Sequence, residues 1–284
     1  MDATGAKGVL TFGSLFSGAG MMDLGIEAAG VRCRWQVEID DYATGVLARH
    51  WPTVPRYRDV HEFPPPVSRL DGLRVDLIAG GFPCPPVSCA GKRRGTADPR
   101  WLWPEMVRVV RLLRPRWVLA ENVRGLLSAG NGSVFAGVLR DLADSGYRVG
   151  WTLLRASDFG YPHRRERVFI VGRLADGAGG GLGIVREPSG GAGLADGGGG
   201  EAIPFAPPGP GDLDAWRAVL ERWPWLAPAL EPGFRRVADG RSVRMDRDRR
   251  QRLKCLGNGV VPACAWYVAS LIAEADHGAR GEQA

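Results

Sequence analysis

Short apolar runs alternate with segments of helical periodicity along roughly the first 173 residues of the chain. In the helical segments, apolar residues recur at three- and four-residue spacing, whereas the runs between them are rich in strand formers. This pattern predicts strands at 8–16, 34–39, 75–80, 117–120, 149–154 and 168–171, and helices at 21–29, 40–51, 101–113 and 134–142. Such an alternation is typical of an α/β fold with a mostly parallel, doubly wound sheet that carries helices on both faces.

The alternation stops after Gly172. Glycine and proline dominate from about 175 to 211, and apolar residues are too sparse there to form a core, which predicts a flexible insertion. Helical periodicity returns at 249–256 and at 262–273, and residues 277–284 are expected to form a flexible tail. Within 174–248, only about 212–247 has enough apolar and aromatic residues to fold.

Composition and charge narrow the class of protein. The 284 residues are 45% hydrophobic, which is enough for a real core, and 37 basic against 31 acidic residues give a net charge of +6. The basic residues cluster at 92–94, 164–167 and 235–254, which indicates a phosphate backbone as partner, although a solvated basic face is the commoner explanation for any single cluster.

Cysteine spacing and hydropathy exclude several other classes. The five cysteines include no C-x-x-C pair, and their odd number argues against a disulfide framework or a zinc site. No run of 18 apolar residues occurs, and the first residues lack the long apolar segment of a signal peptide. We therefore expect a soluble cytoplasmic protein without a bound metal.

The first candidate for chemistry is Cys84. The apolar run that ends near Ala79 leads into a turn rich in glycine and proline, which places Cys84 beyond the carboxyl edge of the predicted sheet, where ligands bind in such folds. Three basic residues at 92–94 would favour the thiolate form. Cys84 is a candidate nucleophile, and the alternative is a small buried hydrophobic residue.

A glycine turn follows the first predicted strand. Phe16, Gly18 and Gly20 are typical of a turn that lets a nucleotide-like cofactor approach the backbone at a helix N-terminus. Asp23 stands where a dinucleotide motif needs its third glycine, which counts against NAD or FAD. Glu38 and Asp59 close the next two strands, where carboxylates can hold ribose hydroxyls and an amino group, or simply cap helices.

Glu121 also ends a predicted strand, and the topology makes that strand a neighbour of the Cys84 turn. A thiolate beside a carboxylic acid suits addition to an electron-poor ring, because the acid can protonate a ring nitrogen as sulfur adds. The segment Arg164-Arg165-Glu166-Arg167 opens a later strand and places alternate arginines on one face, although a salt-bridged strand start would show the same pattern.

Together, the order and spacing of these motifs resemble the DNA (cytosine-5) methyltransferases over residues 9–173 and 249–275. The resemblance rests on five segments: Phe16-Ser17-Gly18-Ala19-Gly20, Gly81-Phe82-Pro83-Cys84-Pro85-Pro86-Val87-Ser88, Glu121-Asn122-Val123, His163-Arg164-Arg165-Glu166-Arg167 and Gly257-Asn258-Gly259-Val260-Val261-Pro262. Each is common alone, but five in family order are highly specific.

The resemblance implies a Rossmann-like catalytic domain that uses S-adenosylmethionine and acts on a flipped-out cytosine in double-stranded DNA. In this reading Cys84 attacks C6, Glu121 stabilises protonation at N3, Arg167 binds the O2 edge, and Arg165 shapes the site or touches phosphate. The cofactor pocket would be lined by Phe16, Gly18, Gly20, Glu38, Ile39, Asp59, Val60, Pro83, Leu102 and Asn258. A basic lid over 88–98 would contact DNA through Ser88, Lys92, Arg93 and Arg94.

The resemblance also implies how the chain is divided. Residues 1–173 would form the catalytic domain, 174–248 a reduced target recognition region, and 249–276 a closing segment whose helix returns to the first helix. A monomeric bacterial or phage-encoded enzyme is expected, associated with the nucleoid and serving in restriction-modification or in phage or host protection, with a possible separate cognate endonuclease.

Three departures from the family pattern keep alternatives open. Pro85 and His163 each stand where the family most often has glutamine, and the recognition region is short and largely of low complexity. Structured RNA is therefore an alternative substrate, and a catalytically silent DNA-binding relic is a second alternative. The intact cysteine, glutamate and cofactor glycines count against the relic.

Overall fold

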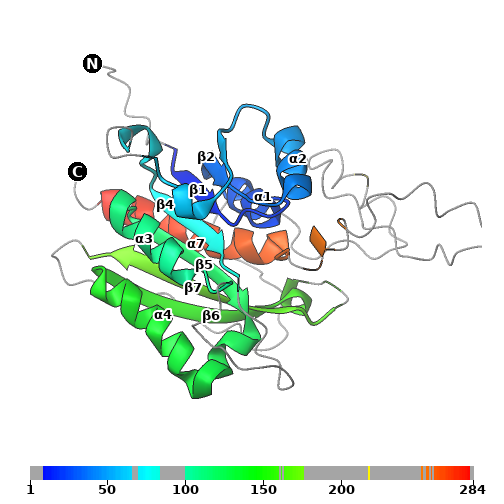
Figure 1. Ribbon diagram of the computed structural model, residues 1–284. Helices are drawn as coiled ribbons and strands as arrows, with labels where there is room; N and C mark the ends of the chain where they lie inside the picture. Colours follow the sequence, from blue (N-terminus) through cyan, green and yellow to red (C-terminus); the bar gives the residue numbers. More distant parts are fainter. Residues whose placement is uncertain are drawn as a thin grey trace, which may run out of the picture.

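A seven-stranded sheet forms the centre of the molecule in the computed structural model (Figure 1). The structure describes residues 9–65, 70–83, 100–159, 161, 163–175 and 259–281, together with 217, 251, 254, 255 and 257. The strands are β1 (Thr11–Leu15), β2 (Arg32–Val37), β3 (Arg56–Tyr57), β4 (Leu77–Gly81), β5 (Trp117–Val123), β6 (Tyr147–Arg155) and β7 (Glu166–Leu174). Their order across the sheet is β3-β2-β1-β4-β5-β7-β6.

The direction of β7 determines which residues meet at the functional edge. The first five strands of the order run parallel, whereas β7 is antiparallel to both β5 and β6. The start of β7 therefore lies at the same edge as the carboxyl end of β5, with Arg167 opposite Val123. A parallel β7 would have placed Arg167 at the far edge.

Helices cover both faces of the sheet. Successive side chains along each strand point to opposite faces, and apolar side chains on both faces need to be buried. Phe12, Leu77 and Leu119 point into one core cluster, and their neighbours Ile78 and Val118 into the other. The helices are α1 (Met21–Ala28), α2 (Asp41–His50), α3 (Trp103–Leu113), α4 (Ser133–Asp144) and α7 (Pro262–Gly281). The first core packs against α1 and α7, and the second packs against α3 and α4.

Among the described residues, 3₁₀ segments connect these elements at η1 (Val60–Glu62), η3 (Asp71–Leu73), η5 (Arg124–Gly132) and η6 (Ala156–Phe159). The predicted α/β sheet with helices on both faces is confirmed. The third strand, β3, has only two residues, which is too short for an alternating hydrophobic pattern to be recognised in the sequence.

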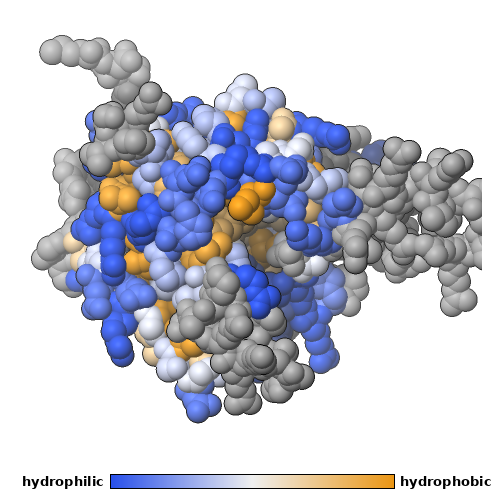
Figure 2. Space-filling model, in the orientation of Figure 1, coloured by the Kyte–Doolittle hydropathy of each residue, from blue (hydrophilic) through white to orange (hydrophobic). Residues whose placement is uncertain are grey.

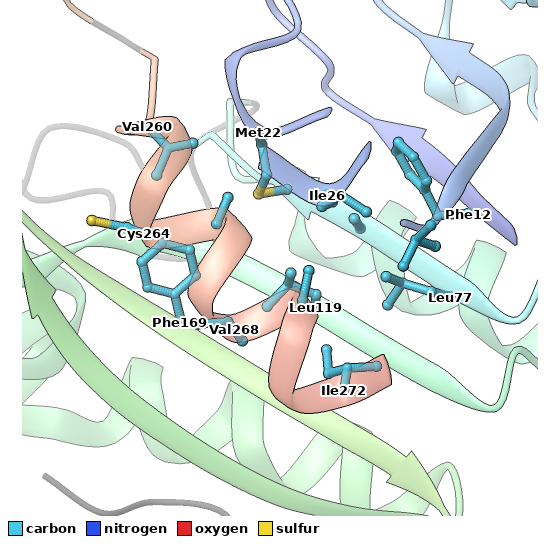
Figure 3. Close-up of a cluster of buried hydrophobic side chains, with 14 of the residues drawn as sticks. Phe12, Met22, Ile26, Leu77, Leu119, Phe169, Val260, Cys264, Val268 and Ile272 are labelled. Carbon is cyan, nitrogen blue, oxygen red and sulfur yellow. The ribbon is translucent and has the colours of Figure 1, made fainter. Parts of the chain in front are cut away.

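The closing helix α7 returns to pack beside α1, although more than 230 residues of sequence separate them (Figures 1 and 3). Figure 3 shows Val260 near Met22 and Val268 near Phe169 of the sheet, and Cys264 belongs to the same buried cluster. Close approach requires Gly25, because a Cβ there would lie 2.3 Å from the Pro262 carbonyl oxygen.

Polar contacts also fix the far end of α7. Asp276 is almost fully buried and accepts hydrogen bonds from Arg116 Nη1 at 2.7 Å and Trp117 Nε1 at 3.1 Å. The sequence predicted that this helix would end near Ala273, but it continues to Gly281. Residues 277–281, expected in a flexible tail, are therefore helical, and the buried Asp276 contact explains why the helix extends this far.

Hydrophilic residues cover much of the described surface in Figure 2, and hydrophobic residues form small separate patches between them. Within the described ranges, no helix combines the length and apolarity needed to cross a membrane. Apart from Arg217, residues 176–250 lie outside the described residues, so the predicted insertion and recognition region stay predictions.

Candidate active site

A cavity of about 540 Å³ opens at the edge where β1, β2, β4 and β5 end and β7 begins. Its wall combines the turn after β1, the end of β2, the end of β4, the end of β5 and the closing segment before α7. The residues predicted from the sequence that line it are Phe16, Gly18, Glu38, Ile39, Pro83, Glu121 and Arg167. One continuous space therefore joins the predicted cofactor turn to the predicted base-binding residues.

The turn after β1 holds an unusual backbone conformation. Phe16 and Gly18 have φ values of 54° and 55°, and Gly20 has 82°. Glycine tolerates this left-handed region, but a phenylalanine there is strained, and such strain concentrates at ligand-binding sites. Gly20 is needed for space as well, because a Cβ would lie 2.4 Å from the Trp51 ring.

Glu38 fixes this turn to the end of β2. Its Oε2 accepts a hydrogen bond from the Gly18 amide at 2.7 Å, and its Oε1 accepts one from the Asp40 amide at 2.8 Å. Each carboxylate oxygen has a second lone pair available. Glu38 therefore shapes the cavity wall and still offers acceptors to a bound ligand.

Four other predicted cofactor residues do not line this cavity. Asp59 caps η1 by accepting from the His61 amide at 2.9 Å. Val60 is buried in the core, where its carbonyl accepts from Arg108, and Leu102 packs partly buried against the same core. Gly20 contributes through the conformation of the turn instead of through the wall.

Glu121 is the central acid of the site. Its side chain is buried at the end of β5, and its Oε1 lies 2.7 Å from Nε of Arg167. Burial raises the pKa of Glu121 to about 7, although the charges of Arg167 and Arg165 oppose this shift. A buried carboxyl with this pKa can hold or release a proton near neutrality.

Neighbouring backbone positions make room for this carboxyl. Gly81 pairs with Glu121 across β4 and β5, and a Cβ at Gly81 would lie 2.8 Å from Glu121 Oε2. The adjacent Asn122 donates from Nδ2 to the Phe82 carbonyl at 2.9 Å. This bond ties the end of β5 to the residues immediately before Cys84, and Pro83 lines the cavity.

Arg165, directly before β7, and Arg167, at its start, have separate surroundings. Arg167 pairs with Glu121, whereas Arg165 donates from Nη2 to the Gly257 carbonyl at 2.6 Å. Burial and the charge of Arg167 lower the pKa of Arg165. Glu166 between them instead pairs with Arg124 and Arg155, at 2.8 and 2.9 Å.

The segment before α7 closes one side of the cavity. Lys254 forms an ion pair of 2.7 Å with Asp40, and both residues line the cavity. Gly259 approaches α1 closely, since a Cβ there would lie 3.0 Å from the Met21 side chain. Neither Lys254 nor Asp40 was predicted as a site residue, because a single lysine among many basic residues carries no spacing signal and Asp40 stood only at the start of the predicted helix 40–51.

Several predicted residues lie outside the described residues: Cys84, Ser88, Lys92, Arg93, Arg94 and Asn258. Their roles, and the lid over 88–98, remain predictions. Among the residues that the structure describes, no group of three or more histidine, cysteine, aspartate or glutamate side chains is placed to hold a metal ion.

Comparison with known proteins identifies the family. The family model for C-5 cytosine-specific DNA methylases matches residues 10–179, which is more than half of the chain. Type II methyltransferase M.HgiCII of Herpetosiphon aurantiacus is 39% identical over 163 residues, covering 57% of this chain and 36% of that protein. Type II methyltransferase M.AquIA of Picosynechococcus is 38% identical over 173 residues, covering 56% of this chain and 70% of that protein.

The fold agrees with this result. The crystal structure of a prophage-encoded Escherichia coli protein, described as a DNA modification methyltransferase, superposes with a TM-score of 0.50 at 28% identity, covering 58% of this chain and 47% of that one. The match to M.HgiCII spans about a third of that relative's length. The chain belongs to the C-5 cytosine-specific DNA methylase family.

Proposed function

We propose that this protein transfers a methyl group from S-adenosylmethionine to carbon 5 of a flipped-out cytosine in double-stranded DNA. The observation that supports this most directly is the buried Glu121–Arg167 pair, which shares one cavity with the strained turn after β1. A proton-carrying acid and a cofactor turn in one space suit a reaction between two bound molecules.

The cavity fits the proposed cofactor in size and charge. Its volume of about 540 Å³ lies in the range of ligand pockets. Among the acids that line it, Asp40 pairs with Lys254 and Glu121 pairs with Arg167, which leaves Glu38 and Asp23 without a neutralising cation among the lining residues. The resulting net negative charge of the lining residues favours binding of a sulfonium cation.

Individual wall residues suit the other parts of the cofactor. Ile39 leaves 67% of its surface exposed beside the cavity, where an apolar side chain can cover the face of a purine. The free lone pairs of Glu38 can accept from ribose hydroxyls, and the amides of the turn can approach polar groups. When bound, S-adenosylmethionine would supply the methyl group.

The base-binding half of the cavity would activate the ring. In this proposal the Cys84 thiolate forms a bond to C6 of cytosine, and Glu121 gives a proton to N3 as the ring electrons shift, which makes C5 nucleophilic. Arg167 holds the Glu121 carboxyl and faces the O2 edge. After methylation, loss of the C5 proton to a base expels the Cys84 sulfur, and return of the N3 proton to Glu121 restores the neutral ring and the acid.

The substrate must leave the duplex for this chemistry. A stacked cytosine shields C6 from a thiolate, so the nucleotide has to be extruded at a cost of a few kcal/mol. The predicted basic residues Lys92, Arg93 and Arg94 would offset part of this cost by contacting phosphates. A methyl group at C5 projects into the major groove, which is consistent with protection of DNA from a nuclease.

Methyl transfer from labelled S-adenosylmethionine tests the proposal. The protein is incubated separately with double-stranded DNA of mixed sequence and with structured RNA, and label in each polymer is counted. We expect label in DNA, none with Cys84→Ala, and at least a ~100-fold lower rate with Glu121→Gln. The surface variant Glu62→Gln should retain full activity, because Glu62 is exposed and outside the cavity.

Other outcomes would change the assignment. Label in RNA alone would replace DNA as the substrate. Undiminished transfer by Cys84→Ala would remove the covalent mechanism, and absence of label in both polymers would contradict the proposed activity.

A further inference from the structure

A buried polar network lies directly beneath the proposed cofactor turn. Asp23, in the first turn of α1, is completely buried. Its Oδ1 accepts a hydrogen bond from Ser14 Oγ at 2.7 Å, and its Oδ2 accepts one from Gln36 Nε2 at 2.9 Å. Ser14 and Gln36 are paired neighbours on β1 and β2, so one carboxylate joins both strands to the helix.

The network continues into the turn itself. Ser17 donates from Oγ to Ser14 Oγ at 2.8 Å, and its amide donates to the Val37 carbonyl at 3.1 Å. Ser17 stands between Phe16 and Gly18, the two residues whose φ values of 54° and 55° give the turn its shape. A chain of contacts therefore leads from Asp23 through Ser14 to the strained backbone.

Asp23 is costly to keep in this place. Burial raises its pKa from 3.8 to about 6, opposed by the hydrogen bonds from Ser14 and Gln36, while the charge of Glu27 raises it further. The pKa of the Cys33 thiol on β2 is raised mainly by burial and secondly by the charge of Asp23. An apolar residue would fill a buried helix position more cheaply, which points to a functional reason for the acid.

We propose that Asp23 is a positioning residue for cofactor binding, which holds the turn at Phe16–Gly18 in its binding conformation through Ser14 and Ser17. The inference rests on the proposed function of this turn. It assigns no contact between Asp23 and the reacting atoms. In the sequence, Asp23 was notable only because it replaces the third glycine of a dinucleotide motif. The proposal gives this residue a structural role of its own.

Substitutions at position 23 can separate the hydrogen bonds of Asp23 from its charge. Among the described residues, Gln36 Oε1 is buried without a hydrogen-bond partner. An asparagine at position 23 would accept from Ser14 through its oxygen and donate through its amide to Gln36, once the Gln36 amide is turned over. Asp23→Asn should thus preserve the network, whereas Asp23→Leu, which keeps the branching at Cγ but has no hydrogen-bonding atoms, should break it.

Titration of S-adenosylhomocysteine into each variant by calorimetry tests the role. We expect Asp23→Asn to bind within about threefold of the wild type, and Asp23→Leu and Ser14→Ala to bind at least ~10-fold more weakly. In steady-state methylation, the KM for S-adenosylmethionine should rise by the same factor while kcat changes less than about threefold. Asp71→Leu, with a fully exposed side chain on η3, is the matched control and should behave as wild type.

The outcomes separate the two proposals. No binding by the wild-type protein would overturn the cofactor assignment and with it the role of Asp23. Normal binding by the wild type and by both Asp23→Leu and Ser14→Ala would overturn the role of Asp23 alone. If Asp23→Leu does not fold, Ser14→Ala decides, because it breaks the path to Ser17 and leaves the carboxylate in place.

Discussion

Arg167 Nε lies 2.7 Å from Glu121 Oε1, across the antiparallel strands β5 and β7. This contact exists because β7 runs opposite to its neighbour, which brings its first residues to the edge where β5 ends. The pairing keeps a buried carboxyl oriented toward the cavity, while burial keeps its pKa near neutrality. A rigid sheet thus presents a proton donor at a fixed point.

Because Gly81 has no side chain, it leaves the space that the Glu121 carboxyl occupies. Alanine there would place a Cβ 2.8 Å from Glu121 Oε2, and the carboxyl must move. We expect Gly81→Ala to lower the rate of methyl transfer roughly 10- to 100-fold, because small displacements of catalytic groups are costly. Calorimetry should show unchanged S-adenosylhomocysteine binding.

Gly72→Ala is the control for this substitution, since nothing lies within 4 Å of a Cβ at Gly72. Full activity of Gly81→Ala would mean that the carboxyl position is not critical.

The pKa of about 7 for Glu121 predicts a pH dependence. The free enzyme needs the protonated carboxyl to give a proton to N3, and this form is lost as pH rises through about 7. We expect kcat/KM for DNA to fall about tenfold per pH unit above that value. The profile of Glu121→Gln should lack this descending limb, because an amide does not titrate. A limb that persists unchanged in Glu121→Gln would assign the titration to another group.

Sequence patterns indicated that Glu121 and Glu38 lie at strand ends, but they did not indicate which groups these side chains contact. Glu121 and Glu38 were both identified because each follows an apolar run, and both line the cavity. That Glu38 would accept from the Gly18 and Asp40 amides could not be predicted, since those contacts depend on how the turn folds back on β2.

The remaining differences also have physical causes. The antiparallel direction of β7 follows from packing across a distant strand pair, and no local pattern encodes it. Asp23 looked like a defect in a glycine motif, but it is the centre of a buried network whose members come from three elements. Asp76, directly before β4, joins β1 in a similar way, since its Oδ2 accepts hydrogen bonds from the Thr11 amide and hydroxyl at 2.9 Å.

Asp23 should also make stability depend on pH. Its pKa is raised from 3.8 to about 6, so the folded protein binds this proton more tightly than the unfolded chain. The associated stability is fully present below about pH 4 and is lost as pH rises to about 6, a change of about 3 kcal/mol. Asp23→Asn cannot lose a proton there.

Urea unfolding of both proteins across this window measures the effect. The stability of Asp23→Asn relative to wild type should increase between about pH 4 and pH 6 and stay constant above it. Asp71→Asn serves as the exposed control. A difference that does not change with pH would show that Asp23 titrates normally.

The contact between α1 and α7 should tolerate no enlargement at Gly25. A Cβ there would lie 2.3 Å from the Pro262 carbonyl oxygen and 2.8 Å from Ala265 Cβ. We expect Gly25→Ala to lower the free energy of unfolding by about 1–3 kcal/mol. Gly137→Ala in α4, where nothing lies within 4 Å, should be neutral or stabilising by about 0.5–1 kcal/mol. Equal stability of the two variants in thermal unfolding would contradict the tight packing.

The most direct test of the central claim is to identify the modified nucleoside. DNA treated with the protein and S-adenosylmethionine is digested to nucleosides and analysed by mass spectrometry, and a second portion is sequenced after bisulfite conversion. We predict 5-methyl-2′-deoxycytidine at a defined sequence, absent with Cys84→Ala and formed at least ~100-fold more slowly with Glu121→Gln. Methylation found only on an exocyclic amino group, or no modified base in DNA of any sequence, would contradict it.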